Sequence, residues 1–228
     1  MLHFFSGSGY QFQPSELKNM ADEQGFIHIM PNGTGPINEG SWNAGLCCDP
    51  AVINNVDEAN FMRQILSDLE TVIQIDPKRI YAVGYSNGGM LAHRLACEMS
   101  DVFAAVASMA GSLVFDPCDP QEPVSVLHIH GLLDQDVPFE GGVMARAGVE
   151  IPSVMEGMEI WAQNNGCTEV SQVPREDSEV VHFSYTDCQS NSAVELYTLE
   201  NHGHTWPANT PFPIHEVIMA FFEAHPRQ

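Results

Sequence analysis

The stretch IYAVGYSNGGMLAHRLAC places a serine in a glycine-rich turn between an apolar run and a run of good helix formers. The apolar residues 80–83 predict a buried strand, and residues 90–99 predict a helix. Gly84 and Gly88 leave room for the backbone to turn sharply between the two. Such a turn holds the hydroxyl of Ser86 above the sheet edge, with the positive end of the helix directed at it. The stretch therefore predicts an α/β fold with Ser86 as a candidate nucleophile.

A serine nucleophile needs a histidine to take its proton and a carboxylate to orient that histidine. In this kind of fold, the acid follows the serine along the chain and the histidine comes last. Asp134 and Asp136 follow the apolar run VSVLHIHG, and His202 and His204 follow the run AVELYTL. Since all four come just after predicted strands, they should reach the same rim of a parallel sheet as Ser86. We favour Asp134 as the acid and His204 as the base, with Asp136 and His202 as their competitors.

Several other histidines fit structural positions better than catalytic ones. His28, His128 and His130 fall inside predicted strands, where core or edge positions are expected. His93 lies in the helix that follows the serine, and a regular helix would point its side chain away from the rim. These four residues are therefore not candidates for the base.

The charge balance excludes some classes of partner. The 228 residues include 30 acidic residues and 8 lysines and arginines, a formal net charge of −22. Such a surface repels the phosphates of nucleic acids and anionic lipids, so we expect neither as a partner. The acidic surface is consistent with a role in solubility and equally with adaptation to salt.

No long apolar segment predicts a membrane span or a targeting signal. The chain has no run of 18 apolar residues. Its start, MLHFFSGSG, lacks the basic region and apolar core of a signal peptide. The protein is therefore expected to be cytoplasmic, or to be exported with a signal that this sequence does not include.

The six cysteines, at positions 47, 48, 97, 118, 167 and 188, do not have the spacing of a zinc site, so no structural metal is expected. An even number allows three disulfides in an oxidising compartment, and six buried thiols are the alternative. Cys167 and Cys188 are the favoured pair, because they flank the polar, turn-rich segment 168–187, which a bridge would close.

Short β-like runs alternate with stretches of helical period, the pattern of a mostly parallel sheet covered by helices on both faces. Strands are expected at 25–31, 79–84, 103–111, 124–131 and 193–199, and helices at 57–74, 87–99, 153–165 and 213–225. Nothing resembles an interdomain linker, so residues 1–228 are expected to form a single catalytic domain. The longest loop, 31–55, is expected to border a ligand site.

A series of short stretches matches a known family in the same order over nearly the whole chain. They are SWNAGLCC, VDEANF, RIYAVGYSNGGMLAHRLACE, FAAVASMAG, HIHGLLDQDVPFEGG, WAQNNGC and NHGHTWP. The chain resembles the esterase family that includes feruloyl esterases and polyhydroxybutyrate depolymerases, in the α/β-hydrolase superfamily. The resemblance is specific, because SNGGM followed by GHTWP is hard to find elsewhere.

The resemblance implies an α/β-hydrolase fold and hydrolysis of carboxylic esters without a metal or an organic cofactor. It implies Ser86 as nucleophile, Asp134 as acid and His204 as base, in agreement with the pattern of the residues themselves. It also implies that Trp42 and Trp206 line the substrate cleft, for which ordinary packing is the alternative. Members of the family are commonly exported, so a secreted or periplasmic location is expected, with a cytoplasmic one as the alternative. The resemblance also supports disulfides that link Cys47 and Cys48 to Cys97 and Cys118.

Two backbone N–H groups are candidates for stabilising the oxyanion of the reaction. The N–H of Asn87 follows the nucleophile directly, and the second donor normally comes from a loop that corresponds here to LHFFSGSG. Matching to the family puts this second donor at Phe5. The chain departs from the family because it reads His3-Phe4 where a His-Gly pair is usual, and because two or more strands usually precede this loop. An unpaired sheet edge would then be exposed and could support a homodimer.

We therefore expect a serine carboxylesterase that acts on short-chain acyl esters, presented as small molecules or on polymers. The alternatives are a feruloyl esterase, a polyhydroxyalkanoate depolymerase, or a non-catalytic binding protein built on a hydrolase scaffold. A serine peptidase is a weaker possibility, since amides demand more protonation of the leaving group than esters.

Overall fold

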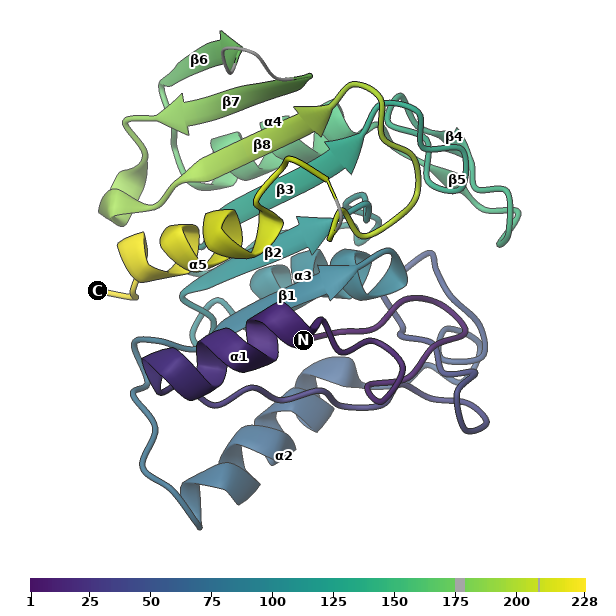
Figure 1. Ribbon diagram of the computed structural model, residues 1–228, viewed down its shortest axis with the longest axis vertical. Coiled ribbons are helices and arrows are strands. Elements are labelled where there is room, and N and C mark those ends of the chain that lie inside the picture. Colours follow the sequence, from purple (N-terminus) through teal and green to yellow (C-terminus); the bar gives the residue numbers. More distant parts are fainter. Residues whose placement is uncertain (175–178, 209) are drawn as a thin grey trace.

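The structure is a computed structural model that describes residues 1–174, 179–208 and 210–228. Its main sheet has six strands in the order β1-β2-β3-β8-β7-β6 (Figure 1). These strands are β1 (Tyr81–Tyr85), β2 (Ala105–Met109), β3 (Ser125–Gly131), β6 (Glu169–Pro174), β7 (Val180–Thr186) and β8 (Val194–Leu199). Strands β1, β2, β3 and β8 are parallel, whereas β7 and β6 continue the sheet as antiparallel strands.

Helices cover both faces of this sheet (Figure 1). They are α1 (Ser15–Gln24), α2 (Glu58–Glu70), α3 (Asn87–Glu98), α4 (Val154–Asn164) and α5 (Ile214–Ala224), beside a small hairpin of β4 (Gly142–Val143) and β5 (Glu150–Ile151) and a short 3₁₀ helix at Gln189–Asn191. Apolar side chains of α2, α3 and α4 share one core cluster, and those of α5 belong to a second cluster. The prediction of a mostly parallel sheet with helices on both faces is confirmed. No helix in the described residues is both long and apolar enough to cross a membrane.

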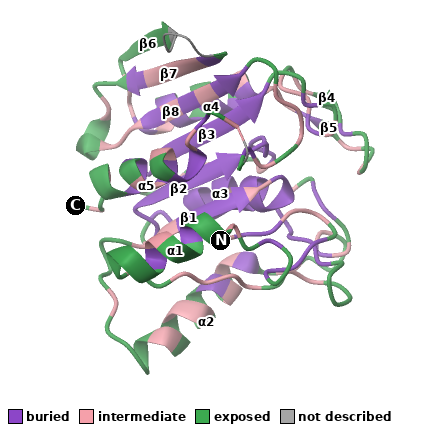
Figure 2. Cartoon of the chain, viewed as in Figure 1, coloured by how far each residue is buried: buried purple, intermediate pink, exposed green. Residues whose placement is uncertain are grey.

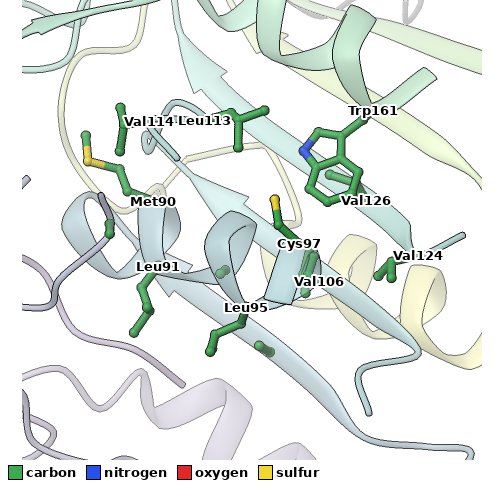
Figure 3. Packing of buried hydrophobic residues seen from close by; sticks show 14 of the residues in the cluster. Met90, Leu91, Leu95, Cys97, Val106, Leu113, Val114, Val124, Val126 and Trp161 are labelled. Atoms are coloured by element: carbon green, nitrogen blue, oxygen red, sulfur yellow. The ribbon is translucent and has the colours of Figure 1, made fainter. Parts of the chain in front are cut away.

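The α3 helix is the most deeply buried helix and packs against β1 and β2, the two strands at one edge of the sheet (Figure 2). Figure 3 shows Leu91 and Leu95 of α3 in the same apolar layer as Val106 of β2, Val126 of β3 and Trp161 of α4. The outer sides of α1 and α2, by contrast, are exposed. The helix that follows the glycine turn is therefore fixed by packing on the sheet and by its neighbouring helices.

The predicted elements from 57 onward form with bounds that differ by a few residues, but the strand predicted at 25–31 is wrong. These residues are not part of any sheet in the described chain. A strand needs a neighbour that pairs with it along its length, and here the amine of Met1 donates one hydrogen bond to the carbonyl of Ile29 at 2.6 Å. Next to it, Leu2 forms a single parallel bridge with Gly84.

Helix α1 and the hairpin of β6 and β7 were not predicted. Helix α1 buries only Leu17 and Ala21. So few core-facing positions give the sequence little helical periodicity to detect. The polar segment 168–187 forms the two antiparallel strands at the edge of the sheet, and its residues 175–178 lie outside the described residues.

The structure contains three disulfides, and one predicted set of cysteine pairs is wrong. Cys167 pairs with Cys188 as predicted, across the β6–β7 hairpin. Cys97, near the end of α3, pairs with Cys118, and their Cα atoms are 5.1 Å apart. The adjacent Cys47 and Cys48 pair with each other. The resemblance had implied disulfides from Cys47 and Cys48 to Cys97 and Cys118, but Cys97 and Cys118 are bonded to each other.

Candidate active site

The turn from β1 to α3 presents Ser86 in a left-handed backbone conformation, with φ 57° and ψ −122°. Few residues other than glycine adopt positive φ, and such strain is concentrated at functional sites. The N–H of Ser86 donates to the carbonyl of Met109 at 2.8 Å, which fixes the turn to the end of β2. A Cβ atom at Gly84 would collide with the carbonyl of Gly88, so the strand and the helix can approach only with glycine there.

Ser86, His204 and Asp134 form a continuous hydrogen-bonded chain. The Nε2 atom of His204 lies 2.9 Å from the Oγ atom of Ser86. The Nδ1 atom of the same ring lies 2.7 Å from Oδ2 of Asp134. Asp134 follows β3 and His204 follows β8, so the carboxyl ends of β1, β3 and β8 each contribute one member. This geometry allows the imidazole to take a proton from the serine while the carboxylate holds the ring.

Asp134 is buried and held as a carboxylate by several donors. Its Oδ1 accepts the backbone N–H groups of Asp136 at 3.0 Å and Val137 at 2.8 Å. Burial by itself would raise the pKa of Asp134, but hydrogen bonds from His130, His204 and the N–H of Val137 outweigh burial and lower it below its usual value. The residue is therefore ionised at neutral pH and able to stabilise a positive charge on His204.

The competing residues lie outside this hydrogen-bonded chain. The Nε2 atom of His202 lies 2.7 Å from the carbonyl of Thr205. The carboxylate of Asp136 lies 3.5 Å from the guanidinium of Arg146. Neither side chain is bonded to Ser86 or His204 in the described chain.

Backbone contacts hold the loops of the acid and the base together. The N–H of Leu133 donates to the carbonyl of His202 at 2.9 Å. A Cβ atom at Gly131 would collide with that same carbonyl, so the end of β3 touches the base loop directly. The hydroxyl of Tyr85 donates to the carbonyl of His204 at 2.8 Å. Sequence reasoning missed Tyr85, although its position directly before the serine was a signal that it would reach the same rim.

The two predicted oxyanion donors lie on segments that touch each other. The carbonyls of Leu2 and His3 contact the Cα of Gly88 so closely that a Cβ there would collide with both. Residues 2–5 therefore run beside the first turn of α3. In the described chain, the N–H groups of Phe5 and Asn87 donate no hydrogen bond to another protein group.

The two predicted cleft tryptophans occupy different environments. Trp42 has no exposed surface, and its Nε1 donates to the carbonyl of His3 at 2.9 Å. The prediction that Trp42 lines an open cleft is therefore wrong. Instead, Trp42 packs against His3 and supports the segment that carries Phe5. Trp206 is partly exposed and lies beside Tyr85, with ring centroids 6.2 Å apart, and Phe12, at 5.3 Å.

The histidines that sequence analysis set aside have structural positions. His93, His128 and His130 are buried and hydrogen-bonded to one another in a row. His28 is half-buried, and neither of its ring nitrogens has a partner. Within the described residues, no group of three or more His, Cys, Asp or Glu side chains is arranged to hold a metal ion.

The amino-acid sequence is similar to known esterases. The profile of the prolyl oligopeptidase family matches residues 10–116. Feruloyl esterase B of Piromyces equi is 29% identical over 214 residues, which cover 89% of this chain and 38% of that protein. Feruloyl esterase C of Emericella nidulans is 26% identical over 164 residues, which cover 71% of this chain and 52% of that protein. The chain thus spans about half or less of the length of these relatives.

The fold has close counterparts among solved structures. The acetyl xylan esterase from Aspergillus awamori superposes with a TM-score of 0.69 at 15% sequence identity, and the match covers 98% of this chain and 87% of that one. The carboxylesterase of Bacillus cereus superposes with a TM-score of 0.58 at 15% identity, covering 98% and 88% of the two chains. These matches agree with the parallel sheet and the serine turn in giving the chain an α/β-hydrolase fold, and its sequence is similar to those of feruloyl esterases.

Proposed function

We propose that this chain is a serine carboxylesterase whose catalytic residues are Ser86, His204 and Asp134. The observation that carries the proposal is the row of hydrogen bonds from Ser86 through His204 to the buried Asp134. The esterase relatives and the neighbouring esterase structures support the same class of reaction. We also infer that residues 1–228 act as one catalytic domain.

The proposed mechanism follows from these positions. His204 accepts the hydroxyl proton as Oγ of Ser86 attacks the ester carbonyl, and Asp134 stabilises the imidazolium that forms. The N–H groups of Asn87 and Phe5 donate to the oxyanion of the tetrahedral intermediate. His204 then gives its proton to the leaving alcohol. A water molecule, deprotonated by the same imidazole, releases the acid from Ser86.

The first test is hydrolysis of p-nitrophenyl esters from acetate to laurate by the wild-type protein and by Ser86→Ala. We expect turnover by the wild type and a loss of at least about a thousandfold in the variant, the scale on which nucleophile removal acts. A serine-directed phosphonate should label the wild type at Ser86 only. Folded wild-type protein that neither turns over an ester nor reacts with the phosphonate would instead be a binding protein on a hydrolase scaffold.

The substrate class that we favour is an ester of a hydroxycinnamic acid. Two relatives carry the name feruloyl esterase. Near His204 the chain offers aromatic surface from the partly exposed rings of Trp206 and Tyr85, which pack on the buried Phe12. Planar aromatic rings favour offset or edge-on packing with one another, which would hold a phenolic acyl group. Short acyl esters and polyhydroxyalkanoates remain the alternatives.

Comparing two substrates tests this assignment. Trp206→Ala should raise KM for methyl ferulate several-fold while leaving KM for p-nitrophenyl acetate, which has no acyl aromatic ring, nearly unchanged. Equal effects on both substrates would contradict an aromatic acyl site at Trp206. The profile match to the prolyl oligopeptidase family makes an amide substrate a useful further comparison. We expect esters to be cleaved much faster than amides.

The disulfides and the fungal relatives support a location outside the cytoplasm. We propose that the protein is exported and meets its ester on a polymer or as a small molecule. Detection of enzyme in the culture medium of the producing cells, rather than in the lysate, is the direct measurement.

A further inference from the structure

A row of buried polar side chains extends from the acid Asp134 to the far side of the sheet. Trp161 of α4 donates its indole N–H to Nδ1 of His93 at 3.0 Å. Nε2 of His93 lies 3.1 Å from Nδ1 of His128, and Nε2 of His128 lies 2.9 Å from Nδ1 of His130. Each of these four side chains is at most 1% exposed. Figure 3 shows the Trp161 end of the row within the apolar layer.

The two ends of this row fix its direction. An indole N–H can only donate, and a carbonyl can only accept. The row begins at the Trp161 N–H and ends where Nε2 of His130 lies 2.9 Å from the carbonyl of Val137. All hydrogen bonds are made at once only if His93, His128 and His130 are neutral and each carries its proton on Nε2. A second proton on any ring would leave two donors facing each other or a donor facing Trp161.

Burial keeps the first two rings of the row, those of His93 and His128, neutral. It lowers the pKa of His93 to about 3 and the pKa of His128 well below its ordinary value. The nearby rings of His130 and His93 lower the pKa of His128 further. These two imidazoles therefore keep their hydrogen-bond direction over the whole physiological pH range.

The last ring of the row meets the acid. Nε2 of His130 lies 3.4 Å from Oδ2 of Asp134, the same oxygen that lies 2.7 Å from Nδ1 of His204. The side chains of His130 and Asp134 are both fully buried. The Nε2–H of His130 donates to the carbonyl of Val137, whose own N–H donates to Oδ1 of Asp134 at 2.8 Å. The Nε2–H of His130 therefore also lies beside the carboxylate oxygen that holds the base.

We propose that His93, His128 and His130 are positioning residues, which together hold the carbonyl of Val137 and keep an N–H beside Oδ2 of Asp134, so that this carboxylate stays aimed at His204. The proposal rests on the proposed esterase function. Sequence analysis placed His128 and His130 at core or edge positions of strands and His93 in the helix after the serine, and the row gives these buried rings a role in the reaction. None of the three is expected to touch substrate.

Paired substitutions at His130 separate positioning from packing. His130→Leu removes the donor, and His130→Gln keeps an N–H at a similar distance from the backbone. We expect kcat to fall roughly tenfold to a hundredfold in His130→Leu, the range for a lost hydrogen bond to a charged group, with KM changed less than about twofold. The Gln variant should recover most of kcat. His28→Leu, which removes a half-buried histidine without ring partners, is the matched control and should keep wild-type kcat.

The outcomes are distinguishable from failure of the esterase proposal. Wild-type turnover that is lost in Ser86→Ala establishes the reaction first. Within that active protein, a folded His130→Leu variant with unchanged kcat would overturn the positioning role, as would equal losses in the Leu and Gln variants. A measurement on the wild type covers the case in which His130→Leu does not fold. The ¹⁵N chemical shifts of the imidazoles should report Nε2–H tautomers for all three rings, and an Nδ1–H tautomer or an imidazolium at His130 would contradict the proposal.

Discussion

The hydroxyl of Tyr85 donates to the backbone carbonyl of His204 at 2.8 Å, which ties the residue before the nucleophile to the residue proposed as its base. The two rings also lie 5.3 Å apart, centroid to centroid. Ser86 and His204 are 118 positions apart along the chain. The contact of Tyr85 thus fixes one loop on another at the place where their spacing matters for proton transfer.

Tyr85→Phe should therefore lower kcat/KM by roughly threefold to tenfold, the value of one neutral hydrogen bond, because the loop of His204 loses an anchor while the ring packing remains. Steady-state kinetics on a p-nitrophenyl ester measure this. Tyr81→Phe, on the same strand but stacked on Phe222, is the matched control and should keep wild-type kinetics. Equal activity of the two variants would show that the hydroxyl of Tyr85 does not position His204.

Gly88→Ala should remove most of the activity without unfolding the protein. Its Cβ would push against the carbonyls of Leu2 and His3 and displace the segment that carries Phe5. Loss of one oxyanion donor costs about a hundredfold to a thousandfold in kcat. Gly203→Ala is the control, since a Cβ there meets its nearest atom, the carbonyl oxygen of Leu133, at an ordinary 3.7 Å. A fully active Gly88→Ala variant would exclude this segment from the oxyanion site.

The rate of ester hydrolysis should fall on acidification. A protonated His204 cannot accept the proton of Ser86, so kcat/KM should decrease as the imidazole takes up a proton. The measurement is kcat/KM against pH in buffers of constant ionic strength. A profile that stays flat down to about pH 4 would exclude a histidine as the base.

Stability should also depend on pH, through two opposing sets of buried groups. Burial lowers the pKa of His93 to about 3, whereas the unfolded chain binds a proton near pH 6.5, so stability is lost as pH falls below 6.5. His128 acts in the same direction. Burial raises the pKa of Glu58 from 4.5 to about 7, so between these values the folded protein holds the extra proton and stability is lost as pH rises.

Glu58→Gln should remove only the loss of stability with rising pH that is due to Glu58. A Gln oxygen can still accept the N–H of Asn43, which Glu58 accepts at 2.8 Å. The free energy of unfolding of the variant should then fall more steeply on acidification between pH 6.5 and 4.5. The expected difference in slope is about 1.4 kcal/mol per pH unit, the value of one proton. Urea unfolding at several pH values measures it. Identical slopes for the two proteins would mean that Glu58 is already ionised in the folded state.

The sequence predicted the parts of the fold and site that depend on local pattern. The apolar run before Ser86, the helix after it and the strand ends before Asp134 and His204 each have a short-range signal, and the structure places all three side chains together. The segment 25–31 has the same kind of signal but forms no strand, because a strand also needs a neighbour. That requirement is set by distant residues, which periodicity does not report.

Side-chain environment was harder to predict than element type. From the sequence, Trp42 and Trp206 are equally good candidates for lining a cleft. In the structure, Trp42 is fully buried against His3, whereas Trp206 is partly exposed beside Tyr85. The bridge between Cys47 and Cys48 was missed because the family resemblance implied other partners for both residues. His128 and His130 were correctly placed in the core, but only the structure links them to Asp134 through a common direction of hydrogen bonding.

Residues 2–5 are held by few bonds, although they carry one of the two proposed oxyanion donors. Leu2 makes one bridge with β1, and His3 is held by the indole of Trp42 and by the N–H of Gly33. Local openings cost less free energy than global unfolding where few contacts must break. Amide protons in this segment should thus exchange with solvent well before those of β2 and β3. A protein of this design can lose its proposed oxyanion donor through local opening of residues 2–5 while its central sheet and its disulfides stay intact.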